Sequence, residues 1–247
     1  MAITPNAPIY TPFSPFLSGL GIAFASGTTI TVAAGVASDV TVTNEISLAA
    51  PVTINAAANG ANGLDTGALA DNAFYAVFVV GDSTDHNATC GLISLSAASP
   101  VLPSGYDMFR RIGYVLTSGA AAILDFSQRG SSADRGMWYA AAIATNITAG
   151  ASATFAAVTA SASVPASSSE IYLKAVLTAD AGATRTAAFR AHSSSSAAGQ
   201  AFTWAPASTV STVSVTCPCD ASGAIDYLVS NAAAAIAIST SGYLDSL

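Results

Sequence analysis

The polar residues best able to do chemistry gather between Asp82 and Asn87, directly after a long apolar run. Asp82, Asp85 and His86 carry groups that bind metals, or that act as a base oriented by a carboxylate. Their spacing matches no metal or catalytic motif, and Asp and Asn are also common turn residues, because their side chains bond to nearby backbone groups. We therefore expect a structural loop here, and a calcium site formed by Asp82 and Asp85 is the alternative.

The cysteines give a second set of candidate ligands. The chain has three, Cys90, Cys217 and Cys219, and an odd number without regular spacing does not indicate a disulfide framework. Cys217 and Cys219 lack the second pair of ligands that a tetrahedral metal site needs. We interpret them as structural residues on one face of a strand or turn, and we predict no metal and no cofactor.

Nucleophile and phosphate motifs are also missing from the sequence. It contains no Gly-x-Ser-x-Gly elbow, no P-loop and no dinucleotide-binding glycines. Two carboxylates far apart in the sequence can still cleave a glycoside if the fold brings them together. The pattern as a whole predicts a protein that is not an enzyme.

Two arginines are candidates for binding another protein. Arg110 and Arg111 open a predicted strand. A guanidinium anchors an interface through a bidentate pair with a carboxylate, for example Asp107 or Asp125. Solvated charges at a sheet edge are the alternative interpretation.

Five aromatic residues of the second half suggest a platform on which a sugar ring stacks. In β-sandwiches such residues more often fill the core. They are Trp138, Tyr139, Trp204, Tyr227 and Tyr243.

Composition narrows the function classes further. Only 9% of residues are charged, the net charge is −7, and no Lys or Arg precedes Arg110. Nucleic-acid binding needs a basic surface, and a secretory leader needs a positive start, so we predict neither. No apolar run is long enough for a membrane-spanning helix. A soluble chain with so little charge is expected to keep much of its surface against other chains, which indicates oligomer or particle assembly.

The elements that must position these residues are predicted to be strands. Apolar and hydroxyl residues alternate over 29–32, 40–43 and 52–55, which is the two-residue period of a half-buried strand. Residues 56–67 are expected to form a loop, and the apolar run 74–80 a central strand buried on both faces. Further strands are predicted at 91–96, 110–117, 121–127, 137–144, 153–158, 170–178, 185–191, 209–216, 224–230 and 235–240.

Two segments are expected to divide the chain. Residues 1–28 contain prolines at 5, 8, 12 and 15, interleaved with Tyr10, Phe13 and Phe16. Because proline removes a ladder donor, we expect an extended arm whose aromatic residues dock on another protein, and a disordered leader is the alternative. Residues 127–136 are rich in Gly, Ser and Arg and are expected to be a linker.

The predicted fold class is therefore all-β. An extended arm at 1–28 precedes two antiparallel domains of the β-sandwich or jelly-roll type, at 29–130 and 131–247. We expect the first domain to oligomerise and the second to lie distally.

Several segments resemble a module found in tailed-bacteriophage virion proteins of the tail-fibre and head-fibre type. The first-half matches are Gly63-Leu64-Asp65-Thr66-Gly67 and residues 72–79, 91–96, 102–107 and 110–113. The closing stretch, residues 224–229 and 241–245, looks like the terminal strands of a second module in the same proteins. The shared motifs concern packing, so no active-site residue carries over.

The resemblance implies a virion structural protein, often a homotrimer, attached to tail or capsid proteins by its N-terminal arm. The sequence departs from the pattern in having no coiled-coil or β-helical shaft, so a short fibre or a capsid decoration protein is expected rather than a long spike. A carbohydrate-binding role on the host surface is a further alternative, and a glycan-degrading tailspike is the alternative from another class.

Overall fold

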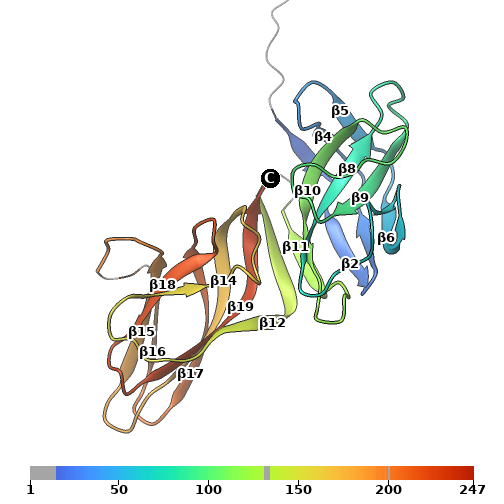
Figure 1. Cartoon of the computed structure of the whole chain (residues 1–247). Helices are drawn as coiled ribbons and strands as arrows, with labels where there is room; N and C mark the ends of the chain where they lie inside the picture. Colours follow the sequence, from blue (N-terminus) through green and yellow to red (C-terminus); the bar gives the residue numbers. More distant parts are fainter. Residues whose placement is uncertain (1–14, 131–133, 198, 200) are drawn as a thin grey trace, which may run out of the picture.

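The chain folds as β structure in two bodies, which meet near the C-terminus (Figure 1). The structure is a computed structural model that describes residues 15–130, 134–197, 199 and 201–247. The all-β prediction is confirmed. The described residues contain no helix, and so none that is long and apolar enough to cross a membrane.

The first domain contains two sheets. The three-stranded sheet has the order β1 (Leu17–Gly19), β4 (Gly35–Ser38), β5 (Glu45–Leu48). The seven-stranded sheet has the order β10 (Met108–Leu116), β8 (Phe74–Gly81), β9 (Thr89–Ser94), β7 (Gly63–Leu64), β6 (Val52–Asn59), β3 (Thr29–Val32), β2 (Ile22–Ser26). Pairing is antiparallel except at the two-residue strand β7, which pairs in parallel with β6 and β9 and so departs from the antiparallel prediction.

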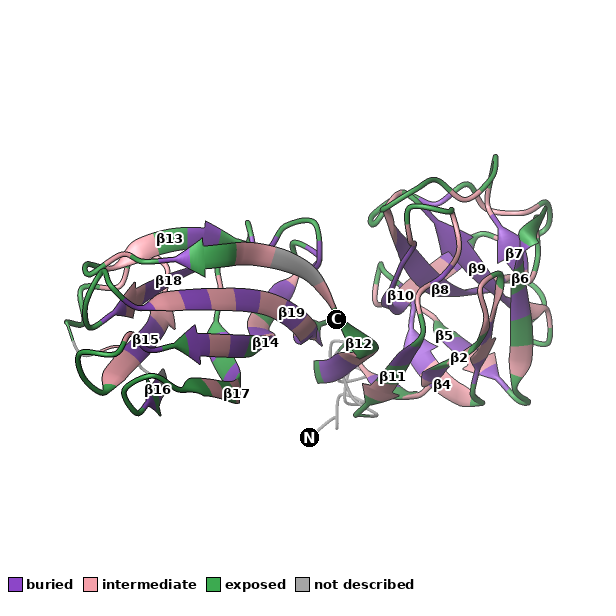
Figure 2. Cartoon of the chain, turned by 90° about the horizontal axis from the view of Figure 1, so that it is seen from below, coloured by how far each residue is buried: buried purple, intermediate pink, exposed green. Residues whose placement is uncertain are grey.

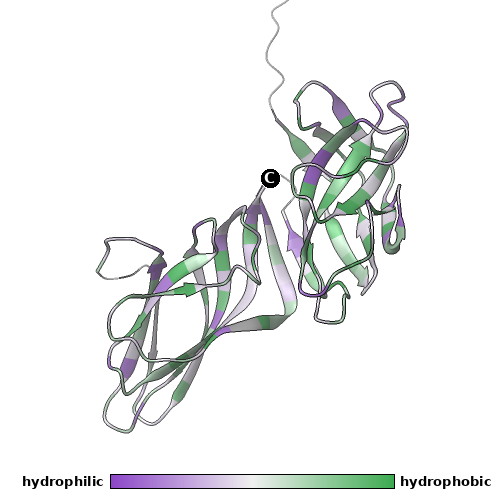
Figure 3. Ribbon diagram, in the orientation of Figure 1, coloured by the Kyte–Doolittle hydropathy of each residue, from purple (hydrophilic) through white to green (hydrophobic). Residues whose placement is uncertain are grey.

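Strand β8 organises the core of this domain, as the apolar run predicted. Tyr75, Val77 and Val79 point into the main core on one face. Phe78 and Val80 point to the other face and pack with a second cluster that includes Tyr114 of β10. Figure 2 shows this burial, and Figure 3 shows the hydrophobic strands gathered inside the domain. Burial on both faces explains why the strand has no alternating polar residues.

The second domain is a sandwich of two sheets. The five-stranded sheet has the order β11 (Phe126–Arg129), β12 (Asp134–Gly150), β19 (Ala235–Ser246), β14 (Ser168–Thr178), β17 (Val210–Pro218). The four-stranded sheet has the order β13 (Ala156–Thr159), β18 (Ala224–Val229), β15 (Arg185–Ala191), β16 (Ala201–Ala205). Without β11, this is the strand order of a jelly roll, as predicted for this half.

Alternation fixes which face of each strand enters the sandwich. Along β14, Ile171 and Leu173 are fully buried, whereas Glu170 and Tyr172 are on the outer face and only half-buried. Apolar burial in the space between the sheets holds the two layers together.

The arm expected over residues 1–28 is shorter in the structure. Strands β1 and β2 occupy residues 17–26, because Leu17, Leu20 and Ile22 are buried in the core of the first domain. Residues 1–14 lie outside the described residues.

The segment expected to be a linker, residues 127–136, consists mainly of two paired strands. Phe126 of β11 pairs with Tyr139 of β12, and Arg129 pairs with Gly136. The segment therefore forms the first hairpin of the second domain, and its residues 131–133 lie outside the described part of the chain.

Three local predictions are also wrong. The strand expected at 121–127 is missing over 121–125, where Ile123 forms only an isolated bridge with Thr117, and β11 begins at Phe126. Residues 40–43 form turns rather than a strand, because the Asp39 carboxylate accepts hydrogen bonds from the backbone N–H groups of Thr43 (2.8 Å) and Asn44 (3.1 Å) and bends the chain. The loop expected over 56–67 instead contains the end of β6 and all of β7, because Leu64 is fully buried and pairs into the sheet.

Candidate docking surface at the domain junction

The two domains meet around Arg135, near the start of β12. Its side chain is fully buried and donates hydrogen bonds to the carbonyl oxygens of Leu20 (2.6 Å) and Ile112 (3.0 Å), both in the first domain. The carboxamide oxygen of Gln128 accepts from Arg135 and also from the backbone N–H of Ile22. Burial lowers the pKa of Arg135 to about 10, so the group stays charged at neutral pH. One buried cation thus ties the second domain to the backbone of the first.

A second polar link joins β10 to the last strand. The guanidinium of Arg111 pairs with the Asp245 carboxylate at 2.8 Å and lies 4.6 Å from the centre of the Tyr114 ring. The side chain of Asp245 is almost completely buried, and this burial raises its pKa, while Arg111 and the hydroxyl of Ser167 act in the opposite direction. The partner of Arg111 is therefore Asp245, and not Asp107 or Asp125.

Aromatic rings fill the space next to this ion pair. Phe74 meets Tyr114 and Tyr243 edge to face, with ring centroids 6.2 Å and 6.3 Å apart. Because Phe74 and Tyr114 belong to the first domain and Tyr243 to the second, the junction combines apolar packing with the polar links.

A pocket of about 470 Å³ opens beside the junction. Its walls are mostly apolar and include Pro15, Val40, Phe109 and Leu247, so both ends of the described chain border it. The wall segment with Ala97 and Ala98 lies between Leu95 and Val101, whose side chains are exposed. Exposed apolar side chains around a concave surface are typical of a site that binds another protein.

Arg110 supplies this pocket with a charge. Its guanidinium is half-buried and forms no ion pair with any of the described residues. Burial and the neighbouring charge of Arg111 lower the pKa of Arg110, while Asp39 acts in the opposite direction. The two arginines therefore differ: Arg111 links the two domains through Asp245, whereas Arg110 has no ion-pair partner among the residues that the structure describes.

Of the aromatic residues expected to dock, Tyr10 and Phe13 lie outside the described residues. Phe16 is half-buried directly before β1. Its carbonyl oxygen accepts a hydrogen bond from the backbone N–H of Ser38 (3.0 Å), and its own N–H donates to the hydroxyl of Ser38 (3.2 Å). The backbone at Phe16 therefore already belongs to the first domain.

The loop from Asp82 to Asn87 has the geometry of successive turns. The Asp82 carboxylate accepts hydrogen bonds from the backbone N–H and the hydroxyl of Thr84, which lower the pKa of Asp82. Asp85 accepts from the backbone N–H of Asn87 at 3.0 Å. Within the described ranges, no group of three or more His, Cys, Asp or Glu residues is arranged to hold a metal ion.

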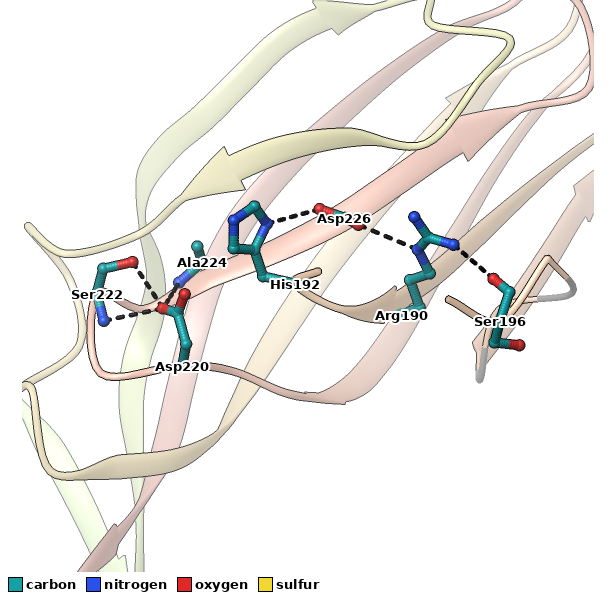
Figure 4. A network of polar contacts seen from close by, with 7 residues as sticks. All are labelled: Arg190, His192, Ser196, Asp220, Ser222, Ala224 and Asp226. Carbon is teal, nitrogen blue, oxygen red and sulfur yellow. Dashed lines mark hydrogen bonds and ion pairs between the residues drawn. The ribbon is translucent and has the colours of Figure 1, made fainter. Parts of the chain in front are cut away.

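A polar network on the second domain was not anticipated from the sequence (Figure 4). Asp226 of β18 is almost fully buried and pairs with Arg190 at 3.0 Å and with Nδ1 of His192 at 2.8 Å. Arg190 also donates to the carbonyl oxygen of Ser196 at 2.6 Å and lies 3.8 Å from the centre of the Phe155 ring. These contacts attach the segment after β15 to the sheet, which is a structural role. Arg190 and His192 are two positions apart and so share a side of the chain, but their pairing with Asp226 is long-range.

The five aromatic residues do not form one platform. Tyr227 and Tyr243 are buried in the core, and Tyr139 donates its hydroxyl to the carbonyl oxygen of Ser163 at 2.8 Å. Trp204 is exposed on β16. Trp138 instead stacks on Tyr172, with ring centroids 4.8 Å apart.

The two neighbouring cysteines are placed by β17. Cys217 is fully buried, and Cys219 follows the strand in a half-buried position. Burial raises the pKa of Cys217 to about 12 and that of Cys219 to about 11. Both thiols are therefore protonated at neutral pH, as is usual for buried structural cysteines.

Comparisons with known proteins add little. No protein-family model and no curated protein matches the chain. A solved structure of an isomalto-dextranase from Arthrobacter globiformis T6 complexed with panose is similar over 93% of this chain and 34% of its own, with 12% identity and a TM-score of 0.23. The chain thus spans about a third of that protein, and a likeness this weak carries no argument about fold or function.

Proposed function

We propose that this chain is a structural subunit of a bacteriophage virion. It would be a short tail-fibre or head-fibre protein that self-assembles and docks on the particle through its N-terminal side, or a capsid decoration protein with the same mode of attachment. The pocket at the domain junction carries the proposal. There, the exposed side chains of Val40, Ala97 and Ala98 and the half-buried ring of Phe109 line a pocket with the half-buried guanidinium of Arg110, at the point where the chain enters the first domain.

The pocket suits a partner segment that combines an apolar side chain with a carboxylate. Burying apolar surface stabilises such a contact by about 25 cal/mol per Å². A carboxylate on Arg110 would add a charge-assisted hydrogen bond and fix the direction of the segment. Several copies on one particle would strengthen attachment through multivalency, even if each contact is weak.

The far end of the molecule also exposes apolar side chains. The connection between β16 and β17 lies at the end of the second domain that is remote from the first (Figure 1). Trp204, before this connection, is 58% exposed, and Val210, after it, is 62% exposed. A subunit with exposed apolar groups at both ends is suited to contacting different neighbours at each end.

The solution mass of the purified chain, measured by light scattering, tests self-assembly. We expect a trimer of about three times 24.4 kDa, both for the full chain and for a variant lacking residues 1–14. The deletion stops at residue 14 because residues 17–26 belong to the core. A monomer at micromolar concentration would contradict self-assembly, and loss of the trimer only in the shortened chain would assign assembly, rather than docking, to the arm.

A further inference from the structure

The outer face of the five-stranded sheet carries an aromatic stack. Trp138 of β12 and Tyr172 of β14 both pair with Gly242 of β19, which lies between them. Their ring planes are 15° apart. Arg129 of β11 lies over the Trp138 ring, with its guanidinium carbon 5.3 Å from the ring centre. The core positions next to the two rings, Met137 and Ile171, are buried, so the stack is not part of the sandwich core.

A pocket of about 370 Å³ lies against this stack. Besides the two rings, its polar side chains are Glu170, Ser214, Thr216 and Ser241. Ser214 and Thr216 occupy outward positions of β17. Ser241 belongs to β19 and lies where the pairing of β19 with β14 shifts its register, between Tyr172 and Leu173. Figure 2 shows the alternating burial along β14 and β19, and this alternation places Glu170, Tyr172 and Ser241 on the outer face.

The polar side chains of this pocket are free to bind a ligand. Among the described residues, no side-chain hydrogen bond or ion pair involves Glu170, Ser214, Thr216 or Ser241. Burial and the nearby Glu170 carboxylate raise the pKa of Tyr172, so its hydroxyl is a neutral donor and acceptor at physiological pH. The pocket therefore offers aromatic surface together with several unused hydroxyls and one carboxylate.

We infer that this pocket binds a neutral saccharide. The C–H face of a pyranose packs on an aromatic ring, while its hydroxyls exchange hydrogen bonds with serine, threonine and carboxylate groups. Among the described residues that line the pocket, Glu170 is the one that carries a charge. Its carboxylate accepts hydrogen bonds from sugar hydroxyls, and no cation in this lining is placed to pair with an acidic sugar. Leu173 and Val215 also line the pocket, but their side chains are buried in the sandwich core. A peptide would need accessible apolar subsites, whereas the accessible groups beside the rings are hydroxyls and one carboxylate.

The inference does not rest on virion assembly, because the pocket lies on the second domain, away from the junction pocket. The inference differs from the sugar platform predicted from the sequence. Of the five aromatic residues named there, Trp138 contributes to this pocket, and its stacking partner Tyr172 was not among them. No single-sequence signal pairs the two, because β12 and β14 meet only through β19.

Calorimetric titration of the full chain with cellohexaose, chitohexaose and maltohexaose tests the inference, with the acidic hexamer of galacturonic acid as a comparison. We expect at least one neutral hexasaccharide to bind with a dissociation constant below about 10 mM, and the acidic hexamer to bind more weakly. No saturable binding of any neutral hexasaccharide at that concentration overturns the inference.

Substitutions in the pocket test whether the saccharide binds at the stack of Trp138 and Tyr172. We expect Tyr172→Ala to weaken binding about tenfold by removing the ring, and Thr216→Val to weaken it about threefold by removing one hydroxyl. Thr212→Val, at an exposed position on the same strand as Thr216 but outside the pocket, is the matched control. Because Tyr172 and Thr216 both point outward, the thermal unfolding midpoint should stay close to that of the unmodified chain. Equal affinity in Tyr172→Ala and Thr212→Val would contradict the assignment, whatever the oligomeric state proves to be.

Discussion

At the scale of single residues, the polar groups of this protein act mainly by fixing turns and junctions. The connection from β14 to β15 is an example. Arg185 forms a bidentate pair with Asp180, with Nη2 2.9 Å from Oδ2, and the backbone N–H of Gly182 donates to the same carboxylate at 3.1 Å. The hydrogen bonds from Arg185 lower the pKa of Asp180 to about 2.

This pair gives a prediction for pH. Replacing Arg185 by Gln should raise the pKa of Asp180 toward its ordinary value of 3.8, because the largest cause of the lowering is then removed. Since the folded-state pKa lies below the unfolded value, the pair stabilises the fold above pH 3.8, and this contribution is lost as the pH falls toward 2. NMR titration of the carboxyl carbons measures the shift. Asp220, whose low pKa comes from Ser222 and Ala224, should not change, and an unchanged Asp180 would contradict the assignment.

At the scale of elements, strands could be predicted from the sequence where burial of one or both faces produces a clear pattern of apolar residues. The run at 74–80 and the alternation at 170–178 correspond to β8 and β14. The strands that were missed, β1, β2, β4, β5, β7 and β16, have at most five residues, too few for a clear period. Apolar and hydroxyl residues alternate over 40–43 as in a strand. The segment forms turns instead, because the Asp39 carboxylate accepts hydrogen bonds from the backbone N–H groups of Thr43 and Asn44.

The candidate site was predictable only in part. Arg110 and Arg111 could be identified as candidate interface residues, because two adjacent charges open a strand in a chain with few charged residues. Asp245 lies 134 positions from Arg111, and no local pattern connects them. The junction pocket and the stack of Trp138 on Tyr172 likewise depend on strand order, which a single sequence does not reveal.

The pairing of β12 with β19 leads to a prediction about an element. Gly242 lies so close to β12 that an added Cβ would be 2.0 Å from the carbonyl oxygen of Met137. Gly242→Ala should therefore separate the two strands and lower the free energy of unfolding by about 2 kcal/mol or more. Urea unfolding measures the loss. Gly119→Ala, where the nearest atom is a side-chain nitrogen of Asn72 at 3.5 Å, should have little effect, and equal losses in both variants would rule out the steric cause.

At the scale of the whole molecule, the relative position of the domains depends on a few buried contacts. Arg135 binds first-domain carbonyls, Arg111 pairs with Asp245, and Phe74 packs on Tyr243. The junction pocket lies between the same elements, so the geometry of the proposed docking surface depends on the junction. Loosening the junction should affect both stability and docking.

The Arg111–Asp245 pair allows this dependence to be tested. Arg111→Met leaves Asp245 buried without its cation, so the pKa of Asp245, already raised by burial, should rise further. A carboxyl group with a raised folded-state pKa costs stability as the pH increases from 3.8 through that value, so the loss should be small at pH 3.5 and reach about 3 kcal/mol at pH 7. Urea unfolding at both pH values measures the loss, and small-angle scattering shows whether the domains separate. Adding Asp245→Asn should restore most of the stability at pH 7, because the uncompensated charge is then gone. A loss of the same size at both pH values would mean that Arg111 stabilises the junction by packing on Tyr114 rather than by its charge.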